Sequence, residues 1–245
     1  MFSSCISLGS AASADTWVIR SDAWCPYNCA PEDSNPGYMV EILQGAALAN
    51  GHQLDYKLLP YSRALQQARE GKITGIVGML AYDRKGFVFS NTMGVDSNCL
   101  IVNKGSGLRY RSKADLDNMS HIGVIEGYGY PQDFVRWRDR NPEKVEALSG
   151  ENALTRQVQK LKAQRLGAFI ENENVFRYAA STSPEMQQVE VAGCMTGRDT
   201  LHIGISTKNP KAKEIKAQVD AYLASIRKNG ELRRLLAKYQ VAPWD

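Results

Sequence analysis

The apolar residues of the first third of the chain recur with more than one period. The segment 17–20 is apolar enough for a strand, and apolar and polar positions alternate over 53–59, as in a half-buried strand. Over 37–50 and 62–70 the apolar residues recur at helical spacing, and the continuous apolar run 73–79 indicates a buried strand. This order predicts a βαβαβ unit, whose parallel strands end at one crevice where such sheets bind small ligands.

The same order of elements recurs in the second half of the chain. A strand is predicted over 122–125, followed by helices and by a further buried strand over 167–170. A strand over 201–205 leads into two final helices, predicted over 210–226 and 231–239. Two similar halves predict two lobes with a cleft between them.

Composition limits the class of protein without identifying a function. The 245 residues are 43% hydrophobic and 23% charged, which is ordinary for a soluble globular protein with a sizeable core. The formal net charge is +4, and the cationic residues are scattered, so we expect no nucleic-acid binding. No apolar run is long enough to predict a membrane-spanning helix.

The N-terminal segment 1–14 resembles the end of a secretory signal. It is rich in Ser and Ala, and Ala12 and Ala14 place small residues at the −3 and −1 positions of a cut before Asp15. The usual cationic start and long apolar stretch are missing, which is consistent with a start codon internal to a longer gene. The alternative is a natural unstructured N-terminus. No apolar run precedes Cys5, so we do not interpret it as a lipid anchor.

The remaining four cysteines fit two disulfides in an oxidising compartment. Cys25 and Cys29 flank a turn, so a local bridge between them is sterically reasonable, and Cys99 and Cys194 would then form a long-range pair. Zinc binding is the rival interpretation, but no second clustered pair of cysteines or histidines follows. Four reduced cysteines are the third alternative.

Several short motifs follow one another in an order that carries a resemblance. In this order the chain resembles a family 3 periplasmic solute-binding protein, of the type that receives polar amino acids for ABC transporters. The motifs are Trp24 to Tyr27, Pro36-Gly37-Tyr38, Gly78 followed by Asp83-Arg84, Phe89-Ser90, Gly127-Tyr128-Gly129, Ile226 to Leu232, and Lys238-Tyr239.

The resemblance implies an α/β, two-lobed periplasmic binding protein fold of type II. Each lobe would be a mostly parallel sheet flanked by helices. Lobe 1 would comprise 15–96 plus 200–245, and lobe 2 would comprise 97–199, inserted into it. Two crossing segments, near 93–97 and 197–201, would act as a hinge on which the lobes close around a ligand.

The resemblance also implies an arginine that grips a ligand carboxylate. Arg84 matches that position, with Lys85 as the alternative register, and a guanidinium can donate two parallel hydrogen bonds to a carboxylate. An ordinary surface arginine is the competing interpretation. Gly78 and Met79, at the end of the strand before it, are expected to line the same side of the site.

A glycine-rich turn and three aromatic residues complete the predicted site. Gly127, Tyr128, Gly129 and Tyr130 lie between a strand and a helix, where backbone N–H groups can hold a carboxylate, although a plain tight turn has the same sequence. The aromatic residues are expected to form walls that shield the ligand and attract a cationic group, unless they are core residues. They are Trp24, Tyr27 and Tyr61.

The chain departs from the family pattern where an Asp commonly binds the ligand ammonium group. Asn172 occupies the matching position, beside Glu171 and Glu173. An amide carries no charge, so ammonium selectivity weakens unless Glu171 turns inward. An acidic loop that caps the next helix is the alternative, and an organic acid or a modified ligand stays open.

These features predict a binding protein without catalytic activity, cofactor or metal. We expect a monomer that captures an amino acid or related carboxylate-bearing compound in the periplasm of a Gram-negative bacterium and delivers it to an ABC permease. A dehydratase-like enzyme on the same scaffold would need a general acid, for which Glu171 and Glu173 are the only well-placed candidates. A stand-alone sensory module is the third possibility.

Overall fold

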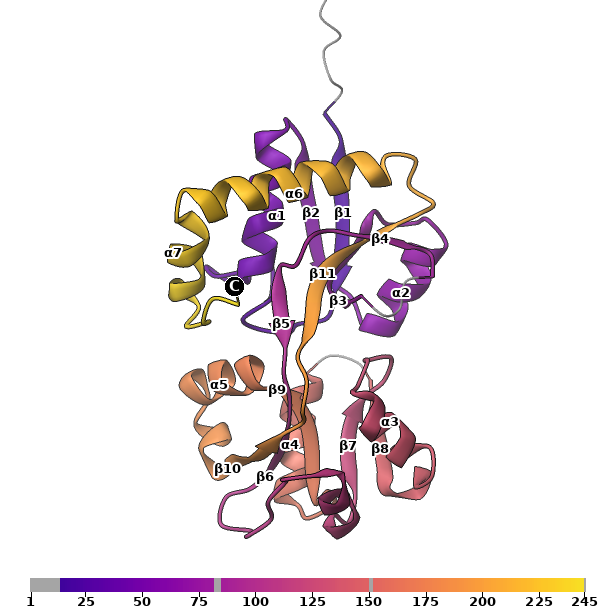
Figure 1. Ribbon diagram of the computed structural model, residues 1–245, viewed down its shortest axis with the longest axis vertical. Coiled ribbons are helices and arrows are strands. Elements are labelled where there is room, and N and C mark those ends of the chain that lie inside the picture. The colour runs from indigo at the N-terminus through magenta and orange to yellow at the C-terminus, as the bar shows by residue number, and fades with distance from the viewer. Residues whose placement is uncertain (1–13, 82–84, 150–151, 245) are drawn as a thin grey trace, which may run out of the picture.

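Two separate β-sheets organise the computed structural model, which describes residues 14–81, 85–149 and 152–244. The first sheet has the strand order β2-β1-β3-β11-β4, with β5 paired to β11, and the second has the order β10-β6-β9-β7-β8. We call each sheet with its helices lobe 1 and lobe 2. The lobes are stacked along the long axis of the molecule (Figure 1).

Lobe 1 contains the first part of the chain and the C-terminal helices. Helix α1 buries Met39, Ile42, Leu43 and Ala46 on one face, as its helical spacing predicts, and packs against α6. The elements are β1 (Thr16–Ser21), α1 (Tyr38–Ala49), β2 (Gln53–Leu58), α2 (Tyr61–Arg69), β3 (Gly75–Leu80), β4 (Phe87–Phe89), β5 (Gly94–Asp96), β11 (Asp199–Ser206), α6 (Ala212–Lys228) and α7 (Glu231–Lys238).

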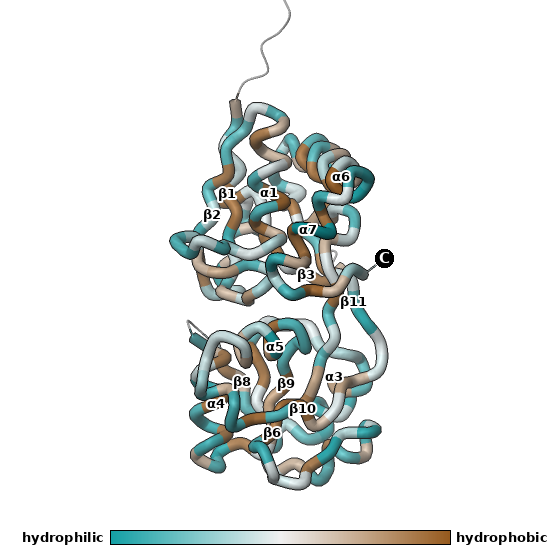
Figure 2. The backbone as a smooth tube through the Cα atoms, turned by 90° about the vertical axis from the view of Figure 1, so that its left-hand side faces the viewer, coloured by the Kyte–Doolittle hydropathy of each residue, from teal (hydrophilic) through white to brown (hydrophobic). Residues whose placement is uncertain are grey.

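Lobe 2 is formed by the middle of the chain. Its core strand β9 is buried along its whole length, and hydrophobic stretches run along the strands of both lobes (Figure 2). Three short 3-10 helices supplement the elements, at Lys113–Asn118, Pro142–Lys144 and Pro184–Gln188. The others are β6 (Asn98–Asn103), β7 (Ile122–Ile125), α3 (Gln132–Arg138), β8 (Val145–Leu148), α4 (Ala153–Lys162), β9 (Ala168–Asn172), α5 (Glu173–Thr182) and β10 (Val189–Cys194).

The sheets are more mixed than the sequence predicts. Strand β1 runs parallel to β2 and β3, which confirms the βαβαβ unit, and β7 runs parallel to β8 and β9. The strands next to the lobe crossings, β6, β10 and β11, pair antiparallel with their neighbours. The carboxyl ends of the parallel strands β1, β3, β7 and β9 therefore meet where the lobes face each other.

Three local features differ from the sequence-based expectations. Helix α2 begins at Tyr61, with Pro60 in the N-cap position, one residue before the predicted start at 62. The short strands β5 and β8 were not expected, because three or four residues give too little periodicity to distinguish a strand from a loop.

Among the described helices, none is long and apolar enough to cross a membrane. Except for Ala14, the expected signal remnant lies outside the described residues.

Two disulfides stabilise the segments around the cleft. Cys99 of β6 and Cys194 of β10 lie opposite each other in the strand register and are bonded, so the disulfide joins the two segments where the chain crosses between lobes. Cys25 and Cys29 close the loop after β1. Both pairs match the expected disulfide pairing. Gly37 lets α1 approach this loop, since a Cβ there would lie 2.5 Å from the Tyr27 carbonyl oxygen.

Candidate functional site

A cavity of about 300 Å³ lies where the strand ends of the two lobes face each other. We call it the polar chamber. Its size fits a small solute. Both lobes contribute to its wall, which is formed by Ser21, Asp22, Trp24, Tyr61, Gly78, Leu80, Asp96, Asn98, Gly127, Tyr128, Gly129, Tyr130, Ile170, Glu171 and Asn172.

The chamber gathers nine residues that the sequence analysis selected, and two others lie behind its wall. Tyr27 is fully buried, with its ring stacked against that of Trp24 at a centroid distance of 4.6 Å. Met79 packs in the lobe 1 core. Arg84 lies outside the described residues. The nine are Trp24, Tyr61, Gly78, Gly127, Tyr128, Gly129, Tyr130, Glu171 and Asn172; that they contact a ligand stays a prediction.

Two acidic residues of the chamber were missed from the sequence. Asp22 directly follows β1, and Asp96 ends β5 at the crossing between lobes. The position of Asp22 was a usable signal, because a polar residue just past a parallel strand points into the crevice. Asp96 gave no such signal, since β5 is too short to be recognised. Ser21, Leu80, Asn98 and Ile170 also line the chamber without having been predicted.

The three carboxyl groups of the chamber are held away from water. Burial raises the pKa of Glu171 to about 7, although the hydrogen bond from the Trp24 indole opposes the shift. Burial likewise raises the pKa of Asp22 to about 6, against the hydrogen bond from Tyr128. It also raises the pKa of Asp96 to about 6, against the hydrogen bonds from two asparagine amides. Desolvation therefore outweighs hydrogen bonding at all three groups.

The described residues of the chamber wall carry acidic groups without a compensating base. Asp22, Asp96 and Glu171 line the cavity, and no lysine, arginine or histidine is found among the described lining residues. A buried carboxylate without a cation is unfavourable, so a ligand that brings a positive charge would relieve the desolvation cost. The electrostatics of the described wall thus favour a cationic group on the ligand.

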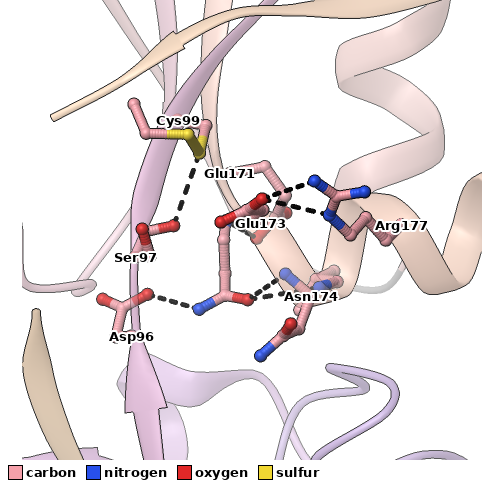
Figure 3. Close-up of a disulfide and its surroundings, with 10 residues drawn as sticks. Asp96, Ser97, Cys99, Glu171, Glu173, Asn174 and Arg177 are labelled. Carbon is pink, nitrogen blue, oxygen red and sulfur yellow. Dashed lines mark hydrogen bonds and ion pairs between the residues drawn. A yellow bond between two sulfur atoms is a disulfide. The ribbon is translucent and has the colours of Figure 1, made fainter. Parts of the chain in front are cut away.

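Asn172 is occupied by contacts within the protein. Its side-chain oxygen accepts from the backbone N–H groups of Asn174 and Val175, at 2.8 and 3.2 Å, and so caps α5. Its amide nitrogen donates to Asp96 over 2.6 Å. Asp96, Glu171 and Asn174 lie close together beside the Cys99–Cys194 disulfide (Figure 3). The charge at this end of the chamber therefore comes from Asp96 and Glu171, not from the position where the family commonly has its Asp.

Direct hydrogen bonds join the two lobes across the chamber. The Tyr128 hydroxyl of lobe 2 donates to Asp22 Oδ2 of lobe 1 over 2.6 Å. The Trp24 indole of lobe 1 donates to Glu171 Oε1 of lobe 2 over 3.0 Å. The Tyr128 ring also meets the Tyr61 ring edge to face, at a centroid distance of 5.4 Å. These contacts show that the two lobes are closed around the chamber.

We expect Tyr128→Phe to weaken this closure while leaving each lobe folded. The variant removes the donor to Asp22 and keeps the aromatic contacts. The closed state should therefore be destabilised by about 1 kcal/mol, which lowers the ratio of closed to open protein about fivefold. Small-angle X-ray scattering of the ligand-free protein should show a larger radius of gyration. Tyr110→Phe, which changes a tyrosine outside the chamber, is the matched control. Equal scattering of the two variants would contradict the role of this bond.

The comparisons with known proteins agree on the fold. The family model of bacterial extracellular solute-binding proteins, family 3, matches residues 18–242. No curated protein matches the chain. An ancestral arginine-binding protein bound to arginine is similar, at 19% identity and a TM-score of 0.76, over 91% of this chain and 97% of that one.

Two further solved structures are similar over most of their length. One is a histidine kinase sensor domain that resembles periplasmic binding proteins, at 15% identity and a TM-score of 0.77, over 93% of this chain and 98% of that one. The other is a putative L-cystine ABC transporter protein from Listeria monocytogenes, at 18% identity and a TM-score of 0.75, over 92% and 96% of the two chains. At these identities the structures establish the two-lobed fold and not the ligand.

Proposed function

Because the chain belongs to family 3 of the bacterial extracellular solute-binding proteins, we propose that it captures a small solute through a cationic nitrogen. The nitrogen pairs with the carboxyl groups of Asp22, Asp96 and Glu171. The observation that carries this proposal is the chamber wall itself, in which these three groups face no described basic side chain. Aromatic rings of Trp24 and Tyr61 add attraction for a cation.

An amino acid or a related amine is the ligand class that this proposal favours. An arginine-bound relative with the same fold supports it. A ligand carboxylate needs a cation of its own, and Arg84 is the proposed partner. The backbone N–H groups of the 127–130 loop are proposed as further donors to the same carboxylate. An amino acid would thus be held at two points, its carboxylate by Arg84 and its cationic nitrogen by the carboxyl groups of the chamber.

The family supports a proposal for the cellular role. We propose that the protein works as a monomer in the periplasm and hands its ligand to an ABC permease, as the similarity to a putative cystine transporter protein suggests. A stand-alone sensory role is the second candidate, supported by the similarity to a kinase sensor domain. An adjacent permease and ATPase gene would favour uptake over sensing.

Catalysis is a weaker candidate that one observation supports. Glu171 is buried in the cleft and has a pKa of about 7, which is suitable for a general acid. We favour binding over catalysis because the described chamber wall holds no histidine, cysteine or lysine that could act with Glu171 as a base or nucleophile. Incubation with each stabilising ligand, followed by mass spectrometry, should recover the ligand unchanged; turnover would overturn this assignment.

A thermal-shift screen with matched triads of compounds tests the proposed ligand class. Each triad contains an amino acid, the amine without its carboxylate, and the acid without its α-amine. In arginine, agmatine and 5-guanidinopentanoate all three compounds keep a guanidinium, whereas in alanine, ethylamine and propionate the acid carries no nitrogen. Ligands should raise the melting temperature by mass action. We expect the stabilising compounds to carry a cationic nitrogen in every case. Stabilisation by nitrogen-free acids alone would refute the proposal.

Arg84→Ala tests the carboxylate clamp separately. We expect the variant to lose about tenfold in affinity for an amino acid and to leave the affinity for its decarboxylated amine unchanged, because a bidentate arginine contributes only where a carboxylate is present. Lys85→Ala is the control, since Lys85 is the alternative register. Calorimetric titration of both variants decides between them. Equal losses for amino acid and amine would remove Arg84 from the clamp.

A further inference from the structure

A second cavity, of about 310 Å³, adjoins the polar chamber. We call it the apolar annex. Asp22, Trp24, Tyr128 and Glu171 line both cavities and so form the wall between them. The residues that line only the annex come from both lobes and include Leu58 of β2 and Thr182 at the end of α5.

The annex has the opposite chemistry to the chamber. Apart from the shared wall, its described lining carries no acidic or basic side chain. Leu58, Leu59 and Pro60 form one side in lobe 1, and Leu154, Val175 and Tyr178 form the other side in lobe 2. An apolar group placed here would lose contact with water without leaving a charge unpaired.

The annex is also closed by contacts between the lobes. Val175 belongs to the lobe 1 core cluster, although it lies on α5 of lobe 2. Leu154 and Tyr178, likewise of lobe 2, are partly buried against the same cluster. Closure of the lobes therefore completes the annex and the chamber together.

The shared wall places charge at the boundary between the cavities. Two hydrogen bonds cross it, from Tyr128 to Asp22 and from Trp24 to Glu171. Glu171 Oε1 accepts two bonds, from Trp24 and from the backbone N–H of Asn172, and no described hydrogen bond reaches its Oε2. Glu171 lines both cavities, and its Oε2 can accept a hydrogen bond from a ligand nitrogen at the boundary between them.

We propose that the natural ligand is an amine-bearing solute with an apolar chain or ring, which fills the annex while its nitrogen contacts the carboxyl groups of the shared wall. This inference rests on the proposed function, because it requires a cationic nitrogen in the chamber. It adds an apolar substituent to the ligand and a second subsite to the cleft.

A series of linear monoamines measures the contribution of the annex. Propylamine, butylamine, pentylamine and hexylamine share one cationic group and differ only in chain length. Each methylene buried in the annex should raise the affinity about fourfold, so that hexylamine binds about 60-fold more tightly than propylamine. Calorimetric titrations at pH 8 give the four dissociation constants.

Two tryptophan variants locate the chain within the cleft. Thr182 lines the annex and is exposed at the end of α5, whereas its exposed neighbour Ser181 lines neither cavity. The indole of Thr182→Trp should occupy space in the annex. The affinity for hexylamine should then exceed the affinity for propylamine by less than tenfold. Ser181→Trp should leave that ratio near its original value.

The outcomes separate this inference from the proposed function. Binding of all four amines with equal affinity would overturn the annex and leave the cationic site intact. A length dependence that both tryptophan variants preserve would also overturn it, because the chain would then lie elsewhere. If none of these amines binds, and no amine of the triads binds either, both proposals fail.

Discussion

An amine ligand should bind at least about 100-fold more weakly at pH 5 than at pH 8. The ligand stays protonated over this range, whereas its carboxyl partners take up protons as the pH falls. The pKa of Glu171 is about 7, so at pH 5 a proton occupies it in about 99 of 100 molecules and must leave before the cation can pair with a carboxylate. Asp22 and Asp96, each with a pKa of about 6, steepen the loss below pH 6.

Calorimetric titrations at half-unit steps between pH 5 and pH 8 test this dependence. The affinity should rise with pH and level off above pH 7.5. Glu171→Gln removes the group that titrates highest, so the rise should then level off about one unit lower. An affinity that is constant with pH, or that rises as the pH falls, would contradict the pairing of ligand cation and buried carboxylate.

Glu171→Gln should stabilise the ligand-free protein by about 3 kcal/mol at pH 8. The folded-state pKa of about 7 lies above the ordinary value of 4.5, so the folded protein binds this proton more tightly than the unfolded chain does. The stability from this protonation is fully present below pH 4.5 and is lost as the pH rises through 7. Glutamine is neutral throughout and keeps an oxygen for the Trp24 indole, so its advantage appears at high pH and vanishes near pH 4.5.

Glu173→Gln is the matched control for this variant. Glu173 lies two residues away, outside both cavities, and pairs with Arg177 at the surface over 2.7 Å. Surface pairs of this kind contribute little, so we expect less than about 1 kcal/mol and no rise with pH. Denaturant unfolding at pH 4.5, 6 and 8 gives the free energies. Equal effects of the two variants at pH 8 would show that Glu171 is not destabilised by burial.

These two results together would show that the carboxyl groups of the site lower the stability of the ligand-free protein. Three desolvated carboxyl groups weaken the closed state until a cation pairs with them. Glu171→Gln should therefore gain stability and lose ligand affinity, about 10- to 100-fold, because one charge-assisted contact is gone. Such opposite changes are typical of groups kept for binding.

The sequence was most informative where periodicity and strand ends coincide. The spacing of Met39, Ile42 and Leu43 gave α1, and the glycine-rich turn after β7 gave the 127–130 wall. The roles of two adjacent residues were harder to predict. Glu171 and Asn172 follow each other at the end of β9 and both line the chamber, and only the packing of α5 decides which of the two caps that helix.

Other parts of the site depend on contacts that no local pattern reports. Trp24 and Tyr27 share one disulfide-closed loop, and their stacking places the tryptophan in the chamber and the tyrosine behind it. Asp96 reaches the chamber through a three-residue strand that pairs with β11, far along the chain. The annex combines residues from both lobes, so its existence follows from closure rather than from sequence spacing.

The proton balance of binding tests the central claim most directly. The ligand that gives the largest thermal shift is titrated at pH 6.5 in two buffers that differ in ionisation enthalpy, which yields the number of protons exchanged. Pairing of a ligand cation with Glu171, Asp22 and Asp96 predicts that protons are released. Uptake of protons on binding would show that the cleft receives an anion instead and would contradict the account.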